Sequence, residues 1–233
     1  MAQPNLSAQL RPTVGPLALL LTSVGLKALM AITGLLMAGF LIAHTAGNLQ
    51  IFAGREVYNA YAAFIHSLGG ALWVMRLALL GAIAVHILAS AKLTSENLGA
   101  REGRYAVKHH AVTNYAARTM VVSGPILGLF IVYHLLHLTF GVTPGDYVHS
   151  ETDAYANFLR GFQIPWVAWF YALANLALGL HLFHGLWSMF QTLGINHPSY
   201  NACLKAVAVL ITLFVAGGNI FMPLAVLSGA VVL

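Results

Sequence analysis

The chain has 233 residues and a formal net charge of +5, and its composition excludes most classes of soluble protein. Hydrophobic residues make up 59% of it and charged residues only 7%, whereas a soluble domain is about 25% charged. The chain is also too apolar to be disordered. Its basic residues do not form one cationic face, so we expect no nucleic acid partner. Its one cysteine excludes a disulfide framework and a cysteine-rich iron–sulfur or zinc site. We therefore expect an all-α, polytopic membrane protein.

The chain is predicted to begin with a polar arm, residues 1–16, followed by one membrane domain, residues 17–233. Five apolar stretches lie in this domain, and each is long enough for the ~20 residues that cross a ~30 Å hydrocarbon core. They run roughly from 24 to 45, 71 to 91, 119 to 141, 165 to 190 and 204 to 230. We expect five transmembrane helices that pack as one bundle in a lipid bilayer.

Charged residues in the loops predict the orientation of this bundle. The loop after the second stretch is basic and the loop after the third is acidic, while Lys27 precedes the first stretch and Lys205 follows the fourth. Because basic residues mark cytoplasmic loops, we predict that the N-terminus is cytoplasmic and the C-terminus is outside. Trp73 and Trp166, which begin the second and fourth stretches, then fall at the outer interface, where aromatic residues are enriched.

Histidine is unusually frequent, with 11 residues in a chain that otherwise avoids polar side chains. Ionisable side chains inside membrane helices are costly, and they are functional candidates by default. Imidazole is a common ligand of haem iron, and two imidazoles can take both axial positions. Six histidines fall within the predicted helices. Four of them lie one in each of the first four helices: His44, His86, His134 and His181. The other two are His137 in the third helix and His184 in the fourth. Four such ligands could hold two b-type haems.

Depth in the membrane predicts how the four histidines pair. His44 lies 17 residues after Lys27, which is ~25 Å above the inner edge at 1.5 Å per residue. His134 lies ~24 Å above the inner edge by the same measure. His86 lies only ~9 Å above that edge, and His181 lies ~22 Å below the outer surface. His44 and His134 therefore share an outer level, and His86 and His181 share an inner level.

The alternatives to haem ligation stay open at this point. His137 and His184 each lie three residues from a candidate ligand on nearly the same helix face, so either could replace its neighbour, bind a haem propionate or only form a hydrogen bond. A lone membrane histidine is more often an interhelical hydrogen-bonding residue than a metal ligand, whereas two pairs matched in depth favour ligation. A haem-free transporter with a histidine proton relay is a further alternative, but it would usually show internal repeats or broken helices.

Other polar residues are candidates for contacts with the cofactors. Arg76 at the outer level, and Lys108 and Arg118 at the inner level, are fixed cations that could pair with haem propionates; their alternative role is anchoring at the membrane interface. Ser23 and Lys27 are candidate hydrogen-bond donors to a quinone at the inner mouth. Their alternative roles are to start a helix and to mark the cytoplasmic side.

Five segments of the chain, in this order along the sequence, resemble those of a known family, and together they cover residues 23 to about 200. They read SVGLKALMAITGLL, HTAGNLQIFAG, VHILASAKLTSENLGAREGRY, ARTMVVSGPILGLFIVYHLLH and GLHLFHGLWSMFQTLGINHPSY, the last being the most distinctive. They resemble the cytochrome b membrane anchor of succinate dehydrogenase and fumarate reductase, the succinate:quinone oxidoreductases, in the single-subunit, five-helix, di-haem class. The di-haem anchor of another quinone-linked enzyme is an alternative, but it lacks the HLFHGLWS and GNLQIF patterns.

The resemblance implies a role in respiratory complex II. It implies that the first and third helices hold the outer haem b, that the second and fourth hold the inner one, and that His134 and His181 are the ligands rather than His137 and His184. It also implies a flavoprotein and an iron–sulfur subunit on the cytoplasmic side, a membrane quinone of the menaquinone type, and a prokaryotic cytoplasmic membrane. Such a chain would not act on succinate alone, and the whole complex could form a higher oligomer.

Overall fold

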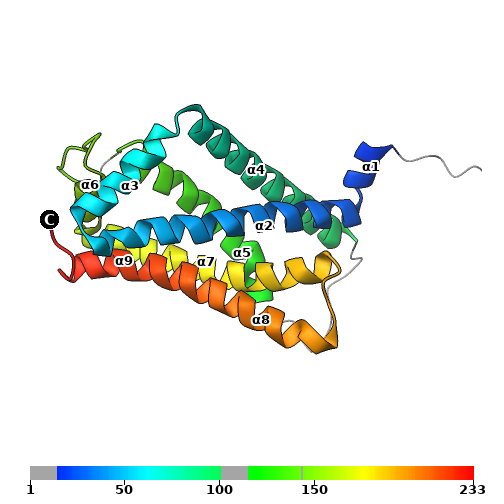
Figure 1. The fold of residues 1–233 in the computed structure, drawn as a ribbon. Coiled ribbons are helices and arrows are strands. Elements are labelled where there is room, and N and C mark those ends of the chain that lie inside the picture. The colour runs from blue at the N-terminus through cyan, green and yellow to red at the C-terminus, as the bar shows by residue number, and fades with distance from the viewer. Residues whose placement is uncertain (1–14, 101–114, 143) are drawn as a thin grey trace, which may run out of the picture.

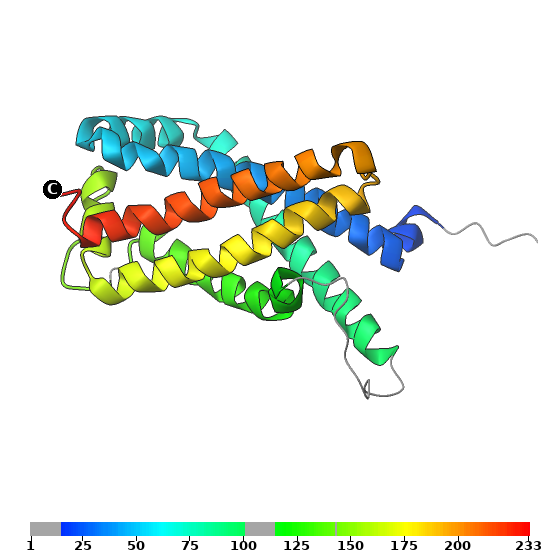
Figure 2. The ribbon, with the colours of Figure 1, turned by 90° about the horizontal axis from the view of Figure 1, so that it is seen from below.

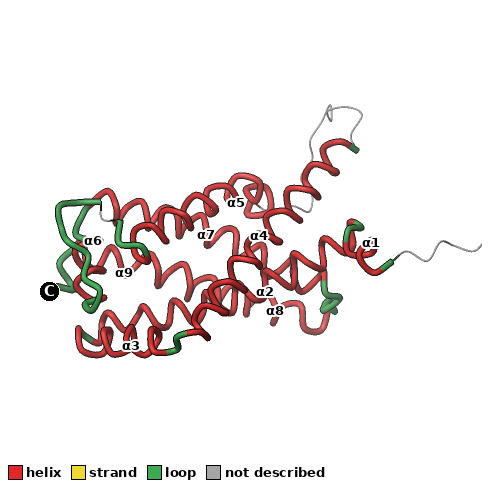
Figure 3. Tube along the Cα trace, turned by 90° about the horizontal axis from the view of Figure 1, so that it is seen from above, coloured by secondary structure: helices red, strands yellow, loops and turns green. Residues whose placement is uncertain are grey.

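The structure, a computed structural model, describes residues 15–100, 115–142 and 144–233 (Figure 1). Nearly all of the predicted polar arm and the candidate Lys108 lie outside the described residues. The described chain is helical and has no strand (Figure 3). Five of its helical segments are long and apolar enough to cross a membrane, so the prediction of an all-α bundle with five such helices is confirmed.

The five long segments follow the predicted stretches in order. The third and fifth contain a π-helical turn, and the first ends in a 3-10 turn. The segments are α2 (Ser23–Asn48) with η2 (Leu49–Ala53), α4 (Gly70–Gly99), α5 (Tyr115–His134) with η3 (Leu135–Thr139), α7 (Pro165–Thr192), and α8 (Pro198–Thr212) with η4 (Leu213–Gly217) and α9 (Gly218–Leu227).

Helix α4 continues eight residues past the predicted end of the second stretch. No proline interrupts it, and Lys92 forms an ion pair of 2.8 Å with Glu96 one turn later. Lys92 is the first residue after the predicted end of the second stretch at 91 and was expected to belong to the basic loop. It lies inside the helix, because a helix does not have to end where its apolar side chains end. Gly99 is the last residue of α4.

Three short helices were not predicted: α1 (Pro16–Leu20), α3 (Arg55–Ser67) and α6 (Ala154–Phe162). The chain turns into α3 at Gly54, whose φ of +93° is unfavourable for other residues. Helix α6 starts at Asp153, whose carboxylate accepts a hydrogen bond from the Ala156 N–H. Helices α3 and α6 pack against each other and form a cap at one end of the bundle (Figures 1 and 3).

Helix α7 is the centre of the bundle. Helices α2 and α5 pack against it, and so do α8 and α9, while α4 packs chiefly against α2 (Figures 1 and 2). The outer faces of α4 and α5 carry exposed apolar side chains that suit contact with lipid, among them Leu77, Leu88, Val121 and Leu129. These contacts place the four helices in the order α4–α2–α7–α5. The two helices of each predicted histidine pair, α4 with α7 and α2 with α5, pack against one common helix.

The two ends of the bundle differ in character. The start of α2, the end of α4 and the start of α8 lie at one end, and they carry Lys27, Lys92 and Lys205. Helices α3 and α6 and the C-terminus lie at the other end (Figure 1). We call these the basic end and the capped end.

Candidate functional site

Toward the basic end, His86 on α4 and His181 on α7 face each other with ring centres 6.4 Å apart. Two imidazoles that bind one metal ion from opposite sides, with metal–nitrogen distances of ~2.0–2.1 Å, have ring centres ~6 Å apart. Both rings are half-buried. The structure thus places the two predicted inner-level histidines at the spacing that axial ligation requires.

A hydroxyl group fixes the other side of each of these rings. The Nδ1 atom of His86 lies 3.1 Å from Oγ1 of Thr33, and the Nδ1 atom of His181 lies 3.1 Å from Oγ of Ser123. Within the described residues no hydrogen bond to Nε2 of either ring is found, and the His86 ring also lies near the Met30 carbonyl. A ring held through Nδ1 that leaves Nε2 for the metal is the arrangement that metal-binding histidines normally have.

The outer pair, His44 on α2 and His134 on α5, has ring centres 5.8 Å apart and an interplanar angle of 85°. Its hydrogen bonds differ from those of the inner pair. The Asn48 amide donates to Nε2 of His44 at 3.2 Å, and the Tyr58 hydroxyl donates to the Asn48 oxygen at 3.0 Å. Nδ1 of His134 is buried without a partner. Metal ligation by His44 would therefore use Nδ1, or Nε2 after Asn48 has moved.

His137 occupies a different environment from His134, although only three residues separate them. It lies in the π-helical turn η3, and the wider turn rotates its side chain away from His44 and toward α6 and α7. The ring is 1% exposed. Its Nδ1 lies 3.0 Å from the Tyr171 hydroxyl and its Nε2 lies 3.4 Å from the Tyr147 hydroxyl. Both nitrogens are engaged, so His137 is placed as a hydrogen-bonded core residue.

His184 is half-buried on α7, and its Nδ1 is buried without a partner. Among the described ring contacts it pairs with no other histidine, whereas His181 one turn earlier faces His86. The structure therefore groups His181, and not His184, with the inner pair.

Two of the three candidate propionate partners, Arg76 and Arg118, fall within the described residues. The Arg76 guanidinium lies over the ring of Trp73, 5.2 Å from its centroid, and Trp73 is 60% exposed. Arg118 is exposed near the start of α5. A half-buried cation stacked on an exposed tryptophan is typical of anchoring at a membrane interface.

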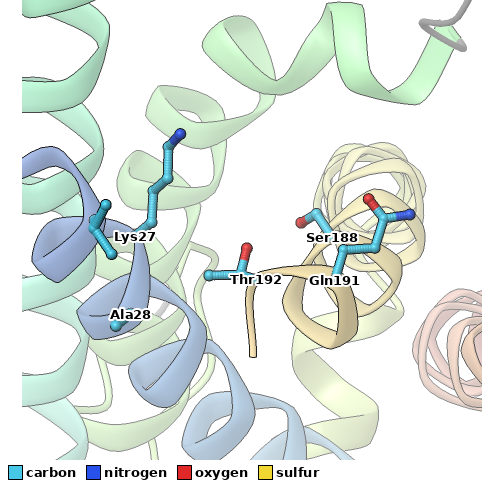
Figure 4. A pocket seen from close by; sticks show the side chains of 6 residues that line it. Lys27, Ala28, Ser188, Gln191 and Thr192 are labelled. Carbon is cyan, nitrogen blue, oxygen red and sulfur yellow. The ribbon is translucent and has the colours of Figure 1, made fainter. Parts of the chain in front are cut away.

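Ser23 and Lys27, the candidate quinone ligands, point to different neighbours. The Ser23 hydroxyl donates to the Glu96 carboxylate on α4 at 3.4 Å. Lys27 lines a cavity of about 350 Å³ between the start of α2 and the end of α7 (Figure 4). Its described lining does not include Ser23; it consists of Val24, Lys27, Ala28, Ser188, Gln191 and Thr192. The residues from α7 in this cavity were not predicted, because they are distant in sequence from Lys27.

At the capped end, a polar cluster joins α3 to α6. The Arg55 guanidinium forms an ion pair with Asp153, and the Asn59 amide donates to the same carboxylate at 2.9 Å. The hydrogen bond from Arg55 is the main reason that the pKa of Asp153 falls to about 2. The cluster holds the cap over the side of the bundle that contains the outer histidine pair.

The histidine pairs suit a haem better than a bare metal ion. Within the described residues, no three His, Cys, Asp or Glu side chains meet at a point that could hold a metal ion. A porphyrin supplies four in-plane nitrogens itself, so that two imidazoles complete the coordination of its iron. The inner pair meets this requirement as it stands. No family model, curated protein or solved structure matches the chain.

Proposed function

We propose that this chain is the di-haem cytochrome b membrane anchor of a succinate:quinone oxidoreductase in a prokaryotic cytoplasmic membrane. It would pass electrons between an iron–sulfur subunit on the cytoplasmic side and a membrane quinone. The observation that carries the proposal is the inner pair, in which His86 and His181 face each other across 6.4 Å and each ring is held through Nδ1 by a hydroxyl. The motifs of the family resemblance, HLFHGLWS above all, support the choice of enzyme.

When bound, each haem supplies one-electron transfer at its iron. His86 and His181 would hold one haem and His44 and His134 the other, and the apolar helices around them would exclude water. Four neutral imidazoles add no fixed charge to the membrane interior, which keeps the cost of burying them low. The basic end, with Lys27, Lys92 and Lys205, is the cytoplasmic side in this proposal, because basic residues accumulate there.

The cavity beside Lys27 supports a quinone site at the basic end. Lys27, Ser188, Gln191 and Thr192 offer hydrogen-bond donors to a carbonyl oxygen, while Val24 and Ala28 supply apolar wall. Ser188 lies seven residues beyond His181 on α7, which is ~10 Å along the helix axis. A quinone head group in this cavity would lie between the inner pair and the cytoplasmic surface.

The first test is a dithionite-reduced minus oxidised spectrum of the purified chain, with a pyridine haemochromogen assay for stoichiometry. We expect two b-type haems per chain. His86→Ala and His181→Ala should each lose one haem and retain the same other one. His197→Ala is the matched control, because His197 caps α8 away from both pairs and should leave both haems in place. A folded chain without haem, prepared with haem available, would overturn the proposal.

A second test addresses the partner enzyme. Deleting the gene in its own organism should abolish succinate:quinone activity and move succinate:dye activity from the membrane to the soluble fraction. If both activities stay in the membrane while the purified chain still contains two haems, the chain is the anchor of another quinone-linked enzyme.

A further inference from the structure

The inner histidine pair depends on two hydroxyl groups that lie on neither of its own helices. Thr33 belongs to α2 and contacts His86 on α4, and Ser123 belongs to α5 and contacts His181 on α7. The two contacts have the same length, 3.1 Å, and both involve Nδ1. Each hydroxyl comes from the helix that packs against the one carrying its histidine.

The two hydroxyl residues also occupy equivalent positions along their helices. Thr33 precedes His44 by 11 residues, and Ser123 precedes His134 by 11 residues. Eleven residues are close to three helical turns, so the hydroxyl and the outer histidine share a helix face, ~16 Å apart along the axis. Helices α2 and α5 thus each carry one outer histidine and, three turns earlier, one contact to an inner histidine.

The backbone offers each hydroxyl an acceptor for its proton, which leaves the hydroxyl oxygen available to the histidine. The Thr33 hydroxyl donates its proton to the Leu29 carbonyl at 2.7 Å, which leaves an oxygen lone pair to accept from His86. The Ser123 hydroxyl lies 3.4 Å from the Met120 carbonyl, which can take its proton in the same way. Nδ1 of each inner histidine is then the protonated nitrogen, and Nε2 keeps the lone pair.

We propose that Thr33 and Ser123 are positioning residues that set the tautomer and the ring orientation of the inner haem ligands. This inference rests on the proposed haem binding by His86 and His181. An Nδ1–H bond to an acceptor makes Nε2 a stronger donor to iron and fixes the rotation of the ring. A hydroxyl acceptor does this without placing a charge in the membrane interior. Within the described residues, no such acceptor contacts Nδ1 of His134, so this device belongs to the inner pair.

The test replaces each hydroxyl by an apolar group of similar size, in Thr33→Val and Ser123→Ala. We expect the affinity for the inner haem to fall ~10–100-fold and the outer haem to stay unchanged. We also expect the midpoint potential of the inner haem to rise, because ferric iron depends more on donation from the ligand than ferrous iron does. If the affinity for ferric haem falls tenfold more than the affinity for ferrous haem, the midpoint potential of this one-electron couple rises by 59 mV.

The readouts are haem stoichiometry and a spectroelectrochemical titration, in which the single-haem His86→Ala variant identifies the signal of the outer haem. Thr33→Ser and Ser123→Thr keep a hydroxyl and should restore occupancy and potential. Thr212→Val is the matched control, since it removes a buried hydroxyl that has no hydrogen-bond partner.

The outcomes separate this inference from the proposed function. Two haems in the wild type, with unchanged occupancy and potential in both Thr33→Val and Ser123→Ala, would overturn the inference and leave the proposed function standing. The inference is also overturned if the hydroxyl-retaining variants behave like the apolar ones. Wild-type chain without haem would overturn both. If one apolar variant does not fold, the other one and its hydroxyl-retaining partner decide the question.

Discussion

Replacing His137 by alanine tests whether this second histidine of the third long helix is a haem ligand or a hydrogen-bonded core residue. The ring is 1% exposed and both of its nitrogens meet tyrosine hydroxyls, so we expect His137→Ala to retain both haems and to lower stability. If His137 were instead the ligand on this helix, the variant would lose the outer haem. His134→Ala provides the comparison, because it should lose that haem.

The expected loss of stability follows from what the ring contacts. Removal leaves the Tyr171 hydroxyl buried without its partner, which costs ~1–3 kcal/mol. It also removes a buried ring that packs against Phe162 and Tyr133, at centroid distances of 5.9 and 5.8 Å, and this costs a further ~2 kcal/mol. A total of ~3–5 kcal/mol corresponds to a fall of roughly 10 °C in the unfolding midpoint for a chain of this length.

Thermal unfolding in detergent, followed by the haem Soret band, measures this effect. The double variant His137→Ala/Tyr171→Phe has no orphaned hydroxyl and should recover ~1–3 kcal/mol. His184→Ala is the matched control: this histidine also lies three residues after a candidate ligand, but it is only half-buried, and we expect both haems and a near-normal midpoint. A folded His137→Ala chain that contains one haem would refute the reasoning.

Three further predictions concern the cap and the helix crossings. Asp153→Asn should lower the unfolding midpoint at pH 7: the pKa of Asp153 is held at about 2 by Arg55, below its ordinary value of ~3.9, so its stabilisation is complete above about pH 5 and is lost toward pH 2. The gap between variant and wild type should therefore close on acidification, and a gap that does not change with pH would contradict this. Gly218→Ala places a Cβ atom 2.9 Å from Cγ2 of the buried Thr45, so we expect it to destabilise the chain by ~1–3 kcal/mol, measured by thermal unfolding. Adding Thr45→Ser removes that methyl group and should restore stability. A double variant as unstable as Gly218→Ala would contradict this. Gly161→Ala places a Cβ atom 2.6 Å from the ring of the buried histidine in η3, so its midpoint should fall while both haems remain, and loss of a haem would count against it.

The spans and the histidine pairing were accessible from the sequence because each depends on one strong physical constraint. A run of about 20 apolar residues is required to cross the bilayer, and depth along a straight helix is simple arithmetic. The pairs His44/His134 and His86/His181, grouped by depth alone, are the pairs whose rings lie 5.8 and 6.4 Å apart. Whether they bind haem is a matter for the experiments above.

Other features depended on weaker or distant signals. The π-helical turn η3 gives the side chains of His137 and His134 different neighbours, and nothing in the sequence HLLH predicts such a turn. Helix α3 is too polar for a search for apolar runs to find, although its start after Gly54 and its acidic first turn at Glu56 are ordinary helix signals. The equal spacing of 11 residues from Thr33 to His44 and from Ser123 to His134 is visible in the sequence, but only the packing of α2 on α4 and of α5 on α7 gives it meaning.

The attachment of α4 has a consequence for how the protein matures. This helix packs chiefly against α2, whereas its histidine faces α7. A cofactor held between His86 and His181 would join α4 to α7 and so give α4 a second attachment besides α2. Chains that have received their prosthetic group would then differ from newly inserted chains in rigidity at the basic end. Before the cofactor is bound, α4 would open at a lower free-energy cost than the other helices, because elements with few packing partners have low local stability.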